Sequence, residues 1–139
     1  MSQYFQVGPQ VLWNPSNNVA ELFVRTGDAL GPLLGLPTGV GPNVNDNYQI
    51  DLDAFGAFVT ALADRYRSST HLILRSLIEG YLVTAVVMLG RAGRAVPDLD
   101  AAAAPHPRDV SVGPDGFGRQ AEPGRLRALV AEHARLMPC

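Results

Sequence analysis

The 139-residue chain contains no lysine, so all 11 of its basic residues are arginine, against 13 acidic residues. The net charge is therefore −2, and no basic run provides the electrostatic footprint by which proteins bind nucleic acid. We expect no DNA or RNA partner. The absence of lysine also excludes a phosphate-binding P-loop, which requires that residue beside its glycines. The arginine bias itself is typical of a GC-rich bacterial genome.

Cysteine is also nearly absent. Cys139, the last residue, is the only one, which excludes an intramolecular disulfide and a cluster of thiolate metal ligands but leaves an intermolecular disulfide open. The three histidines, His71, His106 and His133, lie far apart and lack a second ligand at zinc-site spacing. The sequence therefore predicts no catalytic residue, no metal, no cofactor and no small-molecule substrate, and favours a protein that is not an enzyme.

Long apolar runs and targeting segments are missing as well. The N-terminus does not combine a basic start with an apolar run, so no general secretory signal peptide is predicted. The most apolar window, residues 71–90, is interrupted by Arg75 and Glu79, whose spacing of four predicts a surface ion pair. The uncharged remainder is much shorter than the roughly 20 residues of a spanning helix. We expect no membrane span, in a bacterial protein that is cytoplasmic or secreted without a signal peptide.

Proline is absent from residues 43–96, where a long helix can therefore form. Asp51 is a suitable N-cap for it, and only Ser69 and Thr70 interrupt its apolar pattern. The sequence predicts one helix over residues 52–92, roughly 60 Å long. Its apolar residues recur at steps of three and four, the spacing of one helix face: Leu52, Phe55, Val59, Leu62, Tyr66, Ile73, Leu77, Tyr81, Val86 and Leu89.

The flanking segments complete the predicted fold. Asn14 followed by Pro15 indicates the start of a first helix over residues 15–34, and the Gly-, Pro- and Asn-rich residues 35–50 indicate a turn and loop. The N-terminal segment is extended, short and helical, or a short strand; Trp13 within it is expected to anchor the first helix to the core. The fold class predicted is all-α, an antiparallel helical hairpin over residues 1–96.

The composition changes after residue 96. Residues 97–124 are rich in alanine, proline and glycine, which predicts a linker without a core of its own. Residues 125–139 regain helical spacing and predict a short amphipathic C-terminal helix, which is marginal unless it docks on another element.

A helix of about 40 residues would expose more apolar surface than its shorter companion could cover. We therefore expect it to bind a second copy of the chain, or another small helical protein, and so to form a multi-helix bundle. An alternative is a self-assembling structural or shell component whose tail, residues 97–139, tethers a neighbour or cargo. The residues predicted to bind the partner are Phe55, Val59, Leu62, Tyr66, Ile73, Leu77, Tyr81, Val86 and Leu89.

A lysine-free chain with a helical hairpin and an apolar second helix resembles the small WXG-type proteins of actinobacterial type VII secretion. It is most similar to the ESX secretion-associated hairpins that lack the signature turn. The resemblance covers about residues 11–93, and implies pairing into four-helix bundles, export in folded form, and a role as effector, chaperone-like partner or export domain of a larger toxin. The Trp-x-Gly turn is absent, and Tyr66 and Tyr81 are followed four residues later by Thr70 and Ala85 instead of the acidic residue of the export motif.

Overall fold

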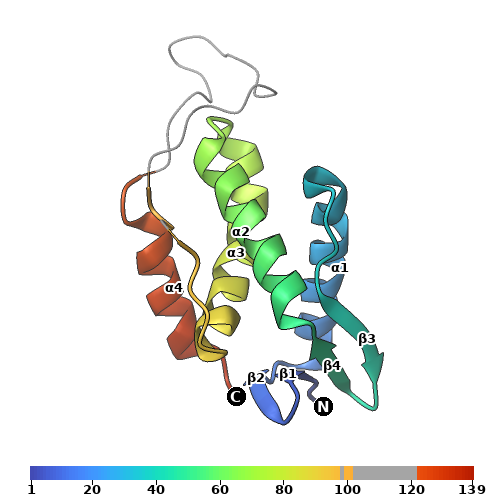
Figure 1. Ribbon diagram of the computed structural model, residues 1–139. Coiled ribbons are helices and arrows are strands. Elements are labelled where there is room, and N and C mark those ends of the chain that lie inside the picture. The colour runs from blue at the N-terminus through green and yellow to red at the C-terminus, as the bar shows by residue number, and fades with distance from the viewer. Residues whose placement is uncertain (98, 102–121) are drawn as a thin grey trace.

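The computed structural model describes residues 1–97, 99–101 and 122–139, and combines helices with a sheet (Figure 1). The fold is therefore α/β, and the all-α hairpin predicted from the sequence is wrong. In chain order the elements are β1 (Tyr4–Val7), β2 (Gln10–Trp13), α1 (Asn17–Leu34), β3 (Val40–Val44), β4 (Asn47–Ile50), α2 (Leu52–Ser68), α3 (Leu72–Arg91) and α4 (Arg125–Leu136).

The sheet has the strand order β2-β1-β4-β3 and consists of two antiparallel hairpins joined in parallel through β1 and β4. The second hairpin occupies the segment that was predicted to be a loop. Its turn contains Asn45 and Asp46 at φ 52° and 64°, a left-handed conformation that these two residue types tolerate. The backbone N–H of Asp46 donates to Oδ1 of Asn43 over 3.0 Å. Polar residues that look like loop in the sequence are thus the turn of a β-hairpin.

An aromatic cluster joins the sheet to the helices. The Phe5 ring on β1 stacks on Tyr48 of β4 at 4.8 Å and on Trp13 of β2 at 5.5 Å, between ring centroids. Trp13 in turn meets Phe23 of α1 edge to face at 5.5 Å, and is only 6% exposed. The prediction that Trp13 anchors the first helix to the core is confirmed. The strands lie at the end of the helices where α2 begins and where α3 and α4 finish (Figure 1).

The helix predicted over residues 52–92 is two helices that fold back on each other. The C-cap of α2 is Ser69, which is extended at φ −81° and ψ 134° and fully buried. The Ser69 hydroxyl accepts from the backbone N–H of His71 over 3.1 Å, and Nδ1 of His71 accepts from Leu74 N–H over 3.3 Å, so that it caps α3. The polar break therefore supplies the caps that end one helix and start the next. The long rod does not exist, and most of its apolar stripe is used within the molecule.

α4 lies where the short C-terminal helix is predicted and packs along α3 (Figure 1). The Arg91 guanidinium holds it there, donating to the carbonyls of Ala134 and Met137 over 3.0 and 2.8 Å and to that of Leu12 over 2.9 Å. One side chain thus ties the end of α3 to β2 and to α4. Most of the predicted linker, residues 97–124, lies outside the described residues.

Candidate functional site

The structure distributes the nine predicted partner-binding residues between the core and the surface. Val86 is half-buried, whereas Ile73 and Leu77 are 53% and 69% exposed. The other six belong to the chain's own core: Phe55, Val59, Leu62, Tyr66, Tyr81 and Leu89. Of the predicted face, Ile73 and Leu77 on the outer side of α3 are therefore the residues most accessible to a partner.

That side of α3 forms an apolar groove with α1. The groove encloses about 370 Å³, and its most exposed walls are Leu22 of α1 (67%) and Leu77 of α3 (69%). Its lining consists of Trp13, Val19, Leu22, Phe23, Thr26, Ser76, Leu77, Gly80, Tyr81 and Thr84. We call this surface the α1/α3 groove. On the α1 wall, Val19, Leu22 and Thr26 recur at helical spacing, but this apolar stripe was not predicted to bind a partner.

The lining of the groove presents few free hydrogen-bonding groups and no charged ones. The Thr26 hydroxyl donates to the Leu22 carbonyl over 2.7 Å and the Thr84 hydroxyl to the Gly80 carbonyl over 2.9 Å, so both are satisfied within their own helices. Burial raises the pKa of the Tyr81 phenol, with a further contribution from the charge of Asp28, and keeps it neutral. None of the lining residues is charged. The groove therefore suits an apolar surface and not an ionic or sugar-like ligand.

Two glycines shape this groove. A Cβ on Gly27 of α1 would lie 2.7 Å from the hydroxyl oxygen of Tyr81, so glycine is what lets the two helices approach. The Tyr81 ring stacks on Phe23 at a centroid distance of 4.4 Å beside this contact. Gly80 is different, because a Cβ there would meet no heavy atom within 4 Å. It leaves a shallow, exposed depression on α3 next to Leu77.

A polar cluster ties α2, α3 and α4 together. Glu79 accepts from the Tyr66 hydroxyl over 2.6 Å and from the Arg125 guanidinium in a bidentate pair with both distances at 2.9 Å. The hydrogen bonds from Arg125 lower the pKa of Glu79 most, against the opposing effect of burial. Burial and the bond to Glu79 raise the pKa of Tyr66 to about 12. A carboxylate engaged in this way is a poor general base, so the cluster is suited to holding helices together.

The predicted ion pair between Arg75 and Glu79 is not formed, since Arg125 occupies the carboxylate. Arg75 is instead 5% exposed, and within the described part of the chain its Nη1 has no hydrogen-bond partner. Its positive charge nevertheless lies close enough to lower the pKa of both Tyr66 and Glu79.

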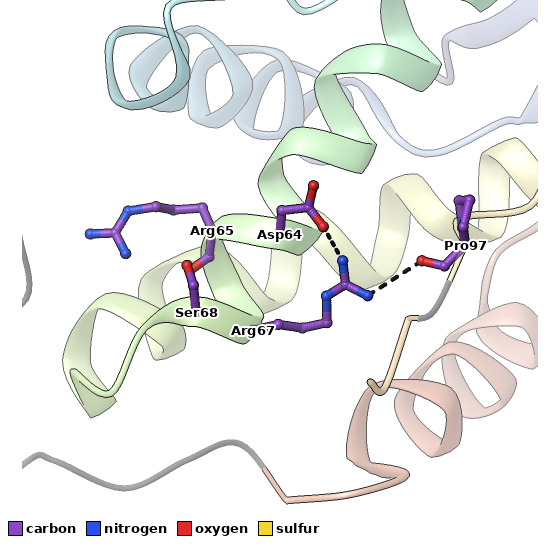
Figure 2. A network of polar contacts seen from close by, with 5 residues as sticks. All are labelled: Asp64, Arg65, Arg67, Ser68 and Pro97. Carbon is purple, nitrogen blue, oxygen red and sulfur yellow. Dashed lines mark hydrogen bonds and ion pairs between the residues drawn. The ribbon is translucent and has the colours of Figure 1, made fainter. Parts of the chain in front are cut away.

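A second polar network secures the end of α2 (Figure 2). Arg67 pairs with Asp64 one turn earlier and donates to the Pro97 carbonyl over 3.4 Å, while the Ser68 hydroxyl donates to the Arg65 carbonyl over 3.2 Å. This network links α2 to the segment that follows α3. These hydrogen bonds and the ion pair join protein groups to one another, so we assign the network a structural role.

The described residues contain no group of three His, Cys, Asp or Glu side chains that could hold a metal ion. Nδ1 of His133 lies 3.0 Å from the Leu129 carbonyl of its own helix, and His106 lies outside the residues that the structure describes. Of the helices seen here, α3 alone has the length and apolar composition to cross a membrane. Half of its most apolar window is buried inside the protein, as in the core helix of a folded domain.

The fold and surface define a small α/β protein with an uncharged groove between two of its helices. The chain matches the family of unknown function DUF6086 over residues 1–139 and belongs to it. No curated protein and no solved structure matches the chain. Family membership supplies no link to type VII secretion, and the helical hairpin that carried that resemblance is not the fold of this chain.

Proposed function

We propose that this protein is a non-enzymatic interaction module that binds the apolar face of a partner helix in the α1/α3 groove. The observation that carries the proposal is the position of Leu22 and Leu77, exposed by 67% and 69% on the two walls of one uncharged groove. Single exposed leucines are common on protein surfaces, but a continuous apolar patch over two elements is typical of a binding site.

The energetics favour such binding. Val19 in the groove is 47% exposed, and Ile73, one turn before Leu77 on α3, extends the patch at 53% exposure. Full burial of one leucine or isoleucine contributes roughly 1.5–3 kcal/mol, so a partner that covered the four side chains would gain several kcal/mol before the entropic cost of association. The Phe23 and Tyr81 rings beneath the patch are already packed, which provides a rigid floor for the partner.

Two titratable side chains of the described residues already have structural roles. Glu79 is fully occupied by Tyr66 and Arg125, and His71 caps α3. The proposal keeps the interaction role expected from the sequence and two of the predicted residues, Leu77 and Tyr81, and adds α1 as the second wall. The alternative, a self-assembling structural or shell component tethered by its Pro-rich tail, stays a prediction, because most of residues 97–124 lie outside the described part of the chain.

Site-specific photo-crosslinking tests this function. A benzoylphenylalanine placed at position 22 should give a discrete protein adduct on irradiation in the host cell, because that position lies on the groove wall. The same residue at position 136, where Leu136 is 74% exposed on α4, is the matched control and should give none. The absence of any protein adduct at position 22, or the same adducts at both positions, would contradict the proposal.

A further inference from the structure

We infer that the partner in the α1/α3 groove is a second copy of this chain, with the two α3 helices packed antiparallel about a two-fold axis. This inference rests on the proposed function and names its partner. Its basis is the order in which large and small residues alternate along the exposed side of α3.

The exposed side of α3 has a large half and a small half. Ile73 and Leu77 are exposed by 53% and 69% and lie on the side toward the start of α3. Gly80 and Thr84 follow at the next positions on the same helix face, since the steps from 73 are four, seven and eleven residues. This face of α3 therefore has a raised half, formed by Ile73 and Leu77, followed by a lower half at Gly80 and Thr84.

A two-fold axis midway between residues 77 and 80 makes this face complementary to itself. In an antiparallel pair, Leu77 of each copy then faces Gly80 of the other, and Ile73 faces Thr84. Every large side chain meets a small one, and each contact occurs twice, as in an isologous interface. A partner helix of unrelated sequence has no reason to match this particular order.

Among the residues that the structure describes, nothing in contact with position 80 requires a glycine there. Glycine inside an exposed helix costs about 1 kcal/mol relative to alanine. Gly27 offsets that cost by making room for Tyr81, but a Cβ on Gly80 would enter open space. What glycine does provide at this position is close approach of another backbone or of a large side chain from outside.

Charge also permits self-association. A face that carried a net charge would repel its own copy, but no charged residue lines the α1/α3 groove. On α1 beside it, Glu21 and Arg25 form an ion pair at 2.6 Å, and Asp28, whose charge acts on Tyr81, is the one further charged residue of that helix. With four large exposed apolar residues in each copy, the patch forms the centre of a small interface, for which we expect a micromolar Kd.

Sedimentation of the full chain tests the inference. The unaltered chain should pass from monomer to dimer as its concentration rises from about 1 to 500 μM, the range around a micromolar Kd. Leu77→Glu should remain monomeric with an unchanged far-ultraviolet spectrum. Leu136→Glu, an equal change at a side chain that is 74% exposed on α4, should dimerise normally. A monomeric natural chain, or a Leu77→Glu variant that dimerises as well as the natural chain, would overturn the inference.

A pair of glycine variants provides a second control. Gly80 and Gly90 both lie exposed on α3 with open space around the Cβ position. Gly80→Gln and Gly90→Gln should therefore both fold, and both should gain helix propensity. Only Gly80→Gln should weaken dimerisation, by at least tenfold in Kd. Equal dimerisation of the two variants would exclude the proposed axis.

The register can be tested directly with cysteine. In a Cys139→Ser background, Leu77→Cys and Gly80→Cys proteins are mixed and treated with a short thiol-specific crosslinker. The proposed axis predicts heterodimeric products at several times the yield from either protein alone, since residue 77 faces residue 80 of the second copy. Higher yield from Leu77→Cys alone would contradict this register.

The two proposals fail in distinguishable ways. If the purified chain is monomeric but position 22 crosslinks to a different protein in cells, the interaction function stands and self-association is wrong. If the chain instead co-sediments with phosphatidylcholine vesicles and Leu77→Glu abolishes this, the exposed face of α3 binds lipid and both proposals are wrong.

Discussion

Gly27 shows how a single absent methyl group sets the distance between two helices. Its backbone lies against the Tyr81 ring, whose hydroxyl oxygen would be 2.7 Å from a Cβ at this position. The same ring stacks on Phe23 and meets Phe58 edge to face, so it has little freedom to move away. The α1/α3 groove therefore depends on this buried glycine.

We expect Gly27→Ala to lower the free energy of unfolding by about 1–3 kcal/mol, because the overpacked methyl must displace the Tyr81 ring or α1. Urea denaturation followed by circular dichroism measures the change. Gly90→Ala is the control, since its Cβ meets no atom within 4 Å, and it should stabilise the chain by up to about 1 kcal/mol. Equal effects of the two substitutions would show that Tyr81 does not restrict position 27.

Glu79 makes the stability of the folded protein decrease at acidic pH. Its pKa is lowered in the folded chain, so its interactions contribute fully above the ordinary value of 4.5 and are lost as the pH falls through the lowered value. The natural chain should therefore be more stable than Glu79→Gln at neutral pH, and the difference in Tm should shrink on acidification towards about pH 3. Thermal melts of both proteins across this range measure it. A difference in Tm that does not change with pH would contradict the assignment.

At the scale of the elements, the backbone of the sheet and the backbone of α2 approach each other closely where the sheet connects to α2. The backbone N–H of Asp51 donates to the Gly39 carbonyl over 2.8 Å, which joins the start of β3 to the start of α2. Gly39 has φ +80°, and a Cβ there would lie 2.3 Å from the backbone nitrogen of Phe55. Glycine is required at this position both by conformation and by space.

Asp51 also caps α2, as predicted from the sequence, by accepting from the Ala54 N–H over 3.2 Å. We expect Asp51→Ala to cost about 1 kcal/mol of stability, the usual loss when a helix cap is removed. Asp51→Asn keeps a side-chain oxygen at the same place and should be nearly neutral. Chemical denaturation of the two variants measures the difference, and a similar loss in both would show that the carboxylate charge matters more than the cap.

At the scale of the whole molecule, Arg91 brings together three segments that are far apart in the chain. Besides the three carbonyls that it binds, its own carbonyl accepts from the Gln10 side chain over 2.8 Å. The backbone N–H of Asn14 donates to the Pro138 carbonyl over 2.8 Å, so the C-terminal end is also held against β2. The first and last parts of the chain are thus joined through the end of α3 (Figure 1).

Arg91→Met should release α4, because methionine can fill the space but cannot donate to the three carbonyls. Hydrogen exchange read by mass spectrometry should show the amides of residues 125–136 exchanging at least tenfold faster, with smaller changes in α2. Arg94→Met removes only an exposed ion pair with Asp53 and should leave α4 protected. Unchanged protection of α4 in Arg91→Met would show that apolar packing alone holds it.

The sequence predicted the helical segments better than their arrangement. Periodicity located α1 and α4 closely, and it also marked the apolar residues of α2 and α3. It could not show that these two helices are separate, because the step from Tyr66 to Ile73 and Leu77 keeps helical spacing across the break, although Tyr66 is buried and the other two are exposed. Ser69 and Thr70 mark the break, but two polar residues can also lie on the exposed side of a continuous helix. Whether the chain turns there depends on what the following helix packs against.

The sheet could not be predicted from the sequence, for a different reason. Its strands are four or five residues long, too short for alternation to be recognised, and β1 pairs with β4, which follows about 40 residues later. By itself the amino-acid sequence determined the helix-forming segments, the Asp51 cap and the buried position of Trp13. Only the tertiary structure decided that α1 would lie beside that face and form a groove, because the contact between Gly27 and Tyr81 joins residues whose separation in the chain leaves no local signal.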